Sequence, residues 1–119
     1  MINKKLKILS LFAGAGGMDL GFKNAGFDIV WANDFDPDSV KTYKRNFGSH
    51  IVLGDIEKIK TNHMPDNPDV VIGGFPYQGF SIANLGRSVD DSRNKLYKQM
   101  LRVIRVKKPK YFVAENVEG

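Results

Sequence analysis

Cysteine is absent from this chain of 119 residues. Its absence excludes a disulfide framework, a thiolate metal site and a cysteine nucleophile. Long apolar runs are absent as well, since none approaches the roughly 20 residues of a membrane span. The basic start at Met1–Lys5 is not followed by the apolar stretch and small-residue cleavage site of a signal peptide. We therefore expect a protein of the cytoplasm.

The net charge of the chain is also small. The chain has 18 basic and 13 acidic residues, for a net charge of +5. A basic excess suits a polyanionic partner, but a value this modest says little by itself. Hydrophobic residues make up 42% and charged residues 26%, which excludes wholesale disorder and a coiled coil. A chain of this length is expected to form one domain with its own core.

Apolar runs and turn signals alternate with helical patterns along the chain. The predicted strands are residues 6–12, 27–32, 51–53, 70–72 and 111–114. The predicted helices are residues 18–25, a segment from Asp36-Pro37 to Gly48, and a segment from the cap at Asp91-Ser92 to just before Pro109. Residues 61–68 are predicted to be a loop. Because strand and helix alternate, we expect an α/β fold with a mainly parallel sheet and helices on both faces.

Three glycines follow the first predicted strand, in the segment Phe12-Ala13-Gly14-Ala15-Gly16-Gly17. Glycines at this place let the backbone approach a ligand closely at the carboxyl edge of a sheet. A dinucleotide fingerprint, G-x-G-x-x-G, would need glycine where the chain has Asp19. The pattern therefore favours a nucleoside ligand without a pyrophosphate over NAD. A plain strand-to-helix turn is the alternative.

Carboxylates follow three further predicted strands. Asp34 can accept hydrogen bonds from both hydroxyls of a ribose, and Phe35 beside it can stack on a purine. Asp55 can accept a hydrogen bond from an exocyclic amine, and Glu115 suits recognition of a base edge. Each carboxylate also has a structural interpretation, since Asp34 can open a turn, Asp55 can cap one and Glu115 can be solvated. Taken together with the glycine turn, they predict an adenosine pocket.

These motifs, in this order, resemble the amino-terminal part of the DNA cytosine-5 methyltransferases. The resemblance runs from Leu6 to Gly119 and is carried by residues 10–17, Asn33-Asp34, Gly54-Asp55-Ile56, residues 74–81, Asp91-Ser92-Arg93 and Glu115-Asn116-Val117. It implies the Rossmann-like fold of S-adenosylmethionine-dependent methyltransferases. It also implies S-adenosylmethionine as methyl donor and a cytosine flipped from duplex DNA as acceptor, in a restriction-modification system.

The resemblance implies roles for individual residues. It assigns cofactor binding to Phe12, Ala13, Gly14, Gly17, Asp34, Phe35, Asp55, Ile56, Pro76 and Leu96. Within this set, Asp34 would bind the ribose and Asp55 the adenine amine. Pro76 would also hold the cytosine together with Glu115, and Arg93 would order the catalytic loop or the base.

One position departs from the family pattern. Where the family has Pro-Cys-Gln, the chain has Pro76-Tyr77-Gln78. In the family a thiolate adds to C6 of cytosine while a carboxylic acid, here Glu115, protonates N3, and C5 then becomes nucleophilic enough to take the methyl group. A phenol titrates near pH ~10 against ~8.5 for a thiol, and it is much bulkier. We therefore expect Tyr77, at the nucleophile's position, to leave this chain catalytically inactive.

The resemblance covers only part of the family's length. Residues 1–119 are expected to form a partial S-adenosylmethionine-dependent catalytic domain, with the target-recognition domain absent or supplied by a complementing carboxyl-terminal chain. An RNA cytosine-5 methyltransferase and a non-catalytic S-adenosylmethionine-binding module are the alternatives, and Tyr77 favours the second. We expect no membrane and no metal partner. His50 and His63 lack a partner at metal-ligand spacing and are expected at the surface.

Overall fold

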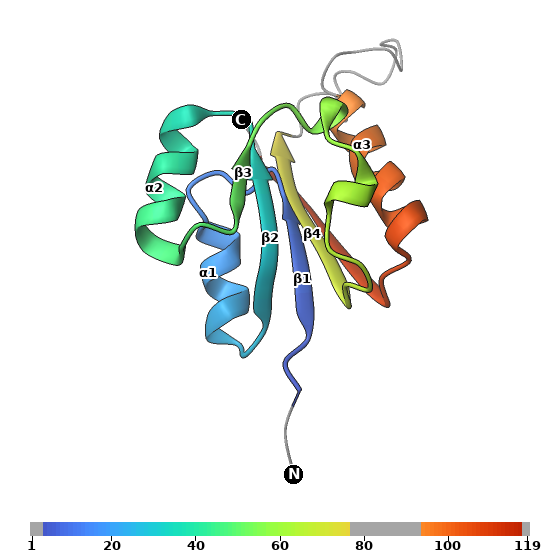
Figure 1. Ribbon diagram of the computed structural model, residues 1–119, viewed down its shortest axis with the longest axis horizontal. Coiled ribbons are helices and arrows are strands. Elements are labelled where there is room, and N and C mark those ends of the chain that lie inside the picture. The colour runs from blue at the N-terminus through green and yellow to red at the C-terminus, as the bar shows by residue number, and fades with distance from the viewer. Residues whose placement is uncertain (1–3, 77–93, 118–119) are drawn as a thin grey trace.

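The computed structural model describes residues 4–76 and 94–117. These residues form a parallel sheet of five strands in the order β3-β2-β1-β4-β5 (Figure 1). The strands are β1 (Lys7–Leu11), β2 (Asp28–Asp34), β3 (Ile51–Leu53), β4 (Val70–Pro76) and β5 (Tyr111–Val117). The helices are α1 (Gly17–Asn24), α2 (Pro37–Phe47) and α3 (Asn94–Lys107), with short 3-10 turns η1 (Ile56–Lys58) and η2 (Thr61–His63). The predicted parallel α/β fold is confirmed.

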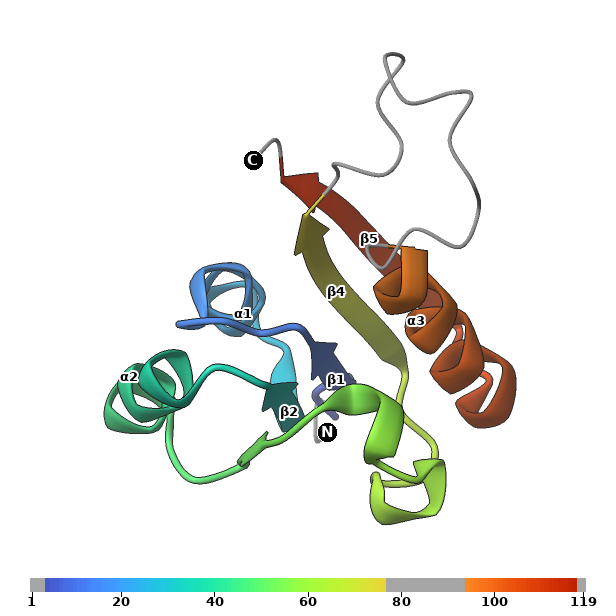
Figure 2. The ribbon, with the colours of Figure 1, turned by 90° about the horizontal axis from the view of Figure 1, so that it is seen from above.

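The sheet is covered on both faces, as predicted. Helices α1 and α2 lie on one face, and α3 lies on the other with the two 3-10 turns (Figure 2). Because side chains alternate along a strand, neighbouring residues of β1 serve different clusters. Ile8 packs on the α1 side, whereas Leu9 and Leu11 pack on the side of α3 with Met100 and Val103. Burial on both faces explains why the central strands are apolar runs rather than alternating patterns.

Helix α2 begins and ends where the sequence predicts. The Asp36 side chain accepts hydrogen bonds from the Ser39 amide at 3.2 Å and the Ser39 hydroxyl at 2.7 Å, and Pro37 occupies the first turn. Gly48 ends the helix with φ 115°. The predicted loop at 61–68 contains the 3-10 turn η2, and the predicted cap of α3 at Asp91-Ser92 lies outside the described residues.

The strand order reverses at β1, and this reversal indicates where on the sheet a ligand would bind. The chain moves outward from β1 to β2 and β3, then returns to pair β4 with the other side of β1. In open α/β sheets, ligands bind outside the carboxyl ends of the strands at such a switch point. Because all pairings are parallel, the glycine turn, Asp34, Asp55 and Glu115 lie together at this edge. Within the described residues, no helix is long and apolar enough to cross a membrane.

Candidate functional site

A cavity of about 240 Å³ lies at the carboxyl edge of the sheet. The ends of β1 and β2, the segment after β3 and the start of α3 supply its lining residues, which are Phe12, Asn33, Asp34, Phe35, Gly54, Asp55, Ile56 and Leu96. All but Asn33 and Gly54 belong to the predicted cofactor set. The Phe35 side chain is 73% exposed, so an aromatic face at this cavity is left open to solvent.

Asp34 is the last residue of β2 and is held by two backbone amides. The Gly14 amide donates to Oδ1 at 3.2 Å, and the Asp36 amide donates to Oδ2 at 3.1 Å. The residue is 8% exposed, so these bonds satisfy a nearly buried carboxylate. Each carboxylate oxygen accepts more than one hydrogen bond. Asp34 therefore holds the turn and can still accept hydrogen bonds from a ligand. The two roles that its position in the sequence allows, in a turn and in a ligand site, are compatible with each other.

Asp55 and Asn33 also line this cavity. Asp55 Oδ1 accepts a hydrogen bond from the Glu57 amide at 3.0 Å and caps η1. The capping interpretation of Asp55 is therefore confirmed, and Asp55 also lines the cavity. Asn33 is 2% exposed, and its side-chain amide donates to the carbonyls of Val52 and Gly54, both at 2.9 Å. Asn33 thereby fixes the segment that carries Asp55. Sequence reasoning gave Asn33 no role, although asparagine is uncommon inside a strand and could have drawn attention to it.

A second cavity, of about 200 Å³, shares Phe12 with the first. It is lined by Ser10, Leu11, Phe12, Ala13, Met18, Asp19, Gly74 and Glu115. Phe12 lines both cavities and has φ 54°, in the left-handed region that non-glycine residues rarely adopt. A Cβ on Gly73 would come within 3.3 Å of the Phe12 ring and 3.1 Å of the Met100 sulfur. The glycine in β4 therefore leaves room for the ring of Phe12, a residue that lines both cavities.

The remaining predicted site residues fall into two groups. A Cβ added at Gly14 or at Gly17 would meet nothing within 4 Å, so the backbone at both positions faces open space. Pro76 is the last residue of β4 and pairs with Val117 of β5, and Glu115 is exposed opposite Gly74. Tyr77 and Arg93 lie outside the described residues.

Gly16 has a different reason to be glycine. It has φ 99°, and a Cβ there would lie 2.3 Å from Phe47 Cε2 and 3.0 Å from Tyr43 Cδ2. We expect Gly16→Ala to lower the free energy of unfolding by about 1–3 kcal/mol through overpacking, with a further cost from the left-handed φ. Urea denaturation measures the loss. Gly17→Ala is the control and should be neutral or stabilising by about 0.4–1 kcal/mol; equal stability of the two variants would contradict the packing role of Gly16.

The two histidines differ from each other. His63 is exposed, as expected. His50 also lies at the surface, where it lines a cavity with Lys23 and Phe47, but it is partly buried and its Nε2 lies 2.9 Å from the Tyr43 hydroxyl. Burial lowers the pKa of this imidazole. Across residues 4–76 and 94–117, no three histidine, aspartate or glutamate side chains are grouped so that they could hold a metal ion.

Comparison with protein families matches residues 6–119 to the C-5 cytosine-specific DNA methylase model. Among curated proteins, the Type II methyltransferase M.NgoFVII of Neisseria gonorrhoeae is 50% identical over 119 residues, which cover 98% of this chain and 32% of the relative. M.NgoPII of the same organism is 46% identical and covers 96% of this chain and 34% of the relative. The chain thus spans about a third of the length of these relatives.

Solved structures show the same fold. A DNA modification methyltransferase encoded within a prophage of E. coli superposes with a TM-score of 0.79 and 36% identity, over 97% of this chain and 33% of that chain. The S. pombe Dnmt2 methyltransferase superposes with a TM-score of 0.72 and 27% identity, over 97% of this chain and 37% of that chain.

Proposed function

The chain belongs to the C-5 cytosine-specific DNA methylase family, and on that basis we propose that it forms the cofactor-binding part of a DNA cytosine-5 methyltransferase of a restriction-modification system. Residues 1–119 would be a partial S-adenosylmethionine-dependent catalytic domain, and the target-recognition domain would lie elsewhere. The bacterial Type II relatives favour this assignment and a cytoplasmic enzyme. The observation that carries the proposal is the cavity at the end of β1, which combines Asp34, Asp55 and Phe35.

The size and lining of the cavity suit the adenosine part of S-adenosylmethionine. At about 240 Å³ it is slightly smaller than the roughly 300–1,000 Å³ of pockets that enclose a drug-sized ligand, and it suits the nucleoside half of the cofactor. Asp34 would accept the ribose hydroxyls, Asp55 the adenine amine, and Phe35 and Leu96 would contact the ring. The open space at Gly14 and Gly17 lets the remainder of the cofactor approach the backbone. When bound, S-adenosylmethionine supplies an electrophilic methyl group.

We place the acceptor cytosine beside the second cavity. Glu115 of β5 and Ala13 of the glycine turn both line it. A carboxylic acid at this place can donate a proton to N3 of the base, which makes the ring more susceptible to nucleophilic addition at C6. The partner would be duplex DNA, held by parts of the enzyme beyond these residues. Pro76, at the end of β4, would hold the base together with Glu115.

Tyr77 favours a second candidate function. A phenol in place of the family's thiol supplies no thiolate to attack C6, so we propose that the chain as it stands transfers no methyl group. In that case it would act as a non-catalytic S-adenosylmethionine-binding module. Both candidates require the same cofactor cavity, so they differ only in catalysis.

Cofactor binding tests the proposal directly. We expect S-adenosylhomocysteine, the demethylated product, to bind the chain in isothermal titration calorimetry and NAD not to bind. Asp34→Ala removes the ribose acceptor and should cost about 1.5–3 kcal/mol, the usual range for hydrogen bonds to a charged group. Asp38→Ala removes an exposed carboxylate from the first turn of α2 and is the matched control. Equal affinity of the Asp34→Ala variant and the unaltered chain would refute the ribose role.

A further inference from the structure

A buried carboxylate lies directly behind the glycine turn. Asp19, in the first turn of α1, is 1% exposed. One of its oxygens accepts a hydrogen bond from the Ser10 hydroxyl at 2.6 Å, and the other accepts one from the Tyr43 hydroxyl. Burial raises the pKa of this carboxyl, and the two hydroxyl donors oppose that rise. Its partners are hydroxyls from β1 and α2, so Asp19 joins three elements at the turn.

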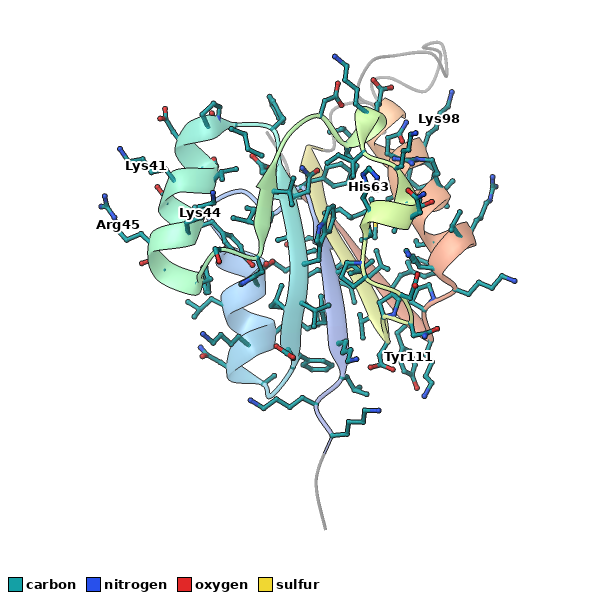
Figure 3. All side chains as sticks on the ribbon, viewed as in Figure 1. Lys41, Lys44, Arg45, His63, Lys98 and Tyr111 are labelled. Atoms are coloured by element: carbon teal, nitrogen blue, oxygen red, sulfur yellow. The ribbon has the colours of Figure 1, made fainter. Side chains whose placement is uncertain are left out.

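Tyr43 contacts the turn in two ways. It lies on the inner side of α2 and is completely buried, whereas Lys41 and Arg45 point from the same helix away from the sheet (Figure 3). Its ring lies under Gly16, where a Cβ would come within 3.0 Å of Cδ2. Its hydroxyl continues to Asp19. The ring therefore sets the position of the start of α1, and the hydroxyl sets its orientation.

His50 extends this set of contacts to the segment before β3. Burial and the neighbouring Asp19 carboxylate raise the pKa of Tyr43, so its hydroxyl stays protonated and donates its only proton to Asp19. The same oxygen then accepts from His50 Nε2, 2.9 Å away, which assigns the proton of a neutral imidazole to Nε2. The chain of contacts runs from Ser10 through Asp19 and Tyr43 to His50.

Asp19 also borders the space that the proposed function uses. It lines the second cavity together with Ala13 and Glu115. The turn itself is closed by the Gly16 amide, which donates to the Ala13 carbonyl at 3.1 Å, and is tied to β2 by the Ala13 amide, which donates to the Asn33 carbonyl at 3.0 Å. A shift at Asp19 would therefore move the backbone that faces the cofactor.

We propose that Asp19 and Tyr43 are positioning residues, whose hydrogen bond holds the glycine turn in the conformation that receives S-adenosylmethionine. This inference rests on the proposed function for the identity of the ligand. The turn's geometry does not depend on it, because the contacts that hold the turn lie within the protein.

The test compares Tyr43→Phe, which keeps the ring and removes only the hydroxyl, with Val103→Ala, which makes a cavity in the core beside α3 and lowers stability without removing a hydrogen bond of the turn. We expect Tyr43→Phe to shift the NMR amide signals of Gly16 and Asp19 and the Nε2 signal of His50. It should also weaken S-adenosylhomocysteine binding about tenfold. Val103→Ala should change neither measurement. Asp19→Asn is the second variant and should match Tyr43→Phe.

The possible outcomes separate the inference from the proposed function. If Tyr43→Phe leaves the amide signals and the affinity unchanged, or if Val103→Ala weakens binding equally, the pair serves only stability and the inference is wrong. If the unaltered chain binds no S-adenosylhomocysteine while Tyr43→Phe still shifts the signals of the turn, the proposed ligand is wrong and the positioning of the turn stands.

Discussion

Tyr77→Cys is expected to restore methyl transfer to C5 of cytosine once the chain is joined to the parts of the enzyme that hold DNA. A suitable host is M.NgoFVII, in which this chain can replace the matching third. The hybrid with Tyr77 should incorporate no tritiated methyl into duplex DNA, because a phenol supplies no thiolate at neutral pH. Loss of the nucleophile in a serine protease costs on the order of 10⁶ in kcat, and we expect the two hybrids to differ by a comparably large factor.

Two controls separate the causes. Tyr77→Ser in the same hybrid relieves the bulk of the phenol without supplying a thiolate, and it should stay inactive if nucleophilicity decides. Tyr77→Cys in the 119-residue chain alone should also stay inactive, because extruding a base costs a few kcal/mol and needs contacts with the duplex. Incorporation by the Tyr77 hybrid would overturn the nucleophile argument. A restored hybrid that methylates RNA and ignores DNA would instead support the RNA alternative.

Glu115→Gln in the hybrid that carries Tyr77→Cys should lower the methylation rate by roughly 10²–10⁴, the usual contribution of a general acid. Glutamine keeps the size of the side chain and loses the proton that we assign to N3 of cytosine. Single-turnover incorporation into duplex DNA measures the effect on the chemical step. Glu57→Gln, at an exposed position in η1, is the matched control.

Cofactor affinity decides what a slow Glu115→Gln enzyme means. If Glu115 acts as the acid, S-adenosylhomocysteine should bind the variant as tightly as it binds the parent hybrid. A matching loss of affinity would place Glu115 in cofactor binding instead. An unchanged rate would remove it from the mechanism.

The sequence alone determined the layers of the fold and the edge that carries the candidate site. Short apolar runs separated by helical patterns require parallel strands, and parallel strands bring their carboxyl ends to one edge. Asp34 and Asp55 were therefore predicted to lie near each other from local signals, a turn residue after an apolar run in each case. The structure places both on the lining of a single cavity. The cap of α2 at Asp36 is similarly local and was predictable for the same reason.

Only the tertiary structure decided which side chains support that edge. From the sequence, Gly16 is one more glycine of a ligand-binding turn. In the structure it packs against the Phe47 ring of α2, which leaves no room for a side chain. In the sequence, Asp19 showed only that the last glycine of a dinucleotide fingerprint is missing. Its hydrogen bond with Tyr43 joins residues 24 positions apart. The contact of His50 with Tyr43 could not be predicted, because Tyr43 lies on a helix whose packing the sequence does not specify. Periodicity shows that a residue faces inward, whereas the contacts of a buried polar side chain depend on how helices pack on the sheet.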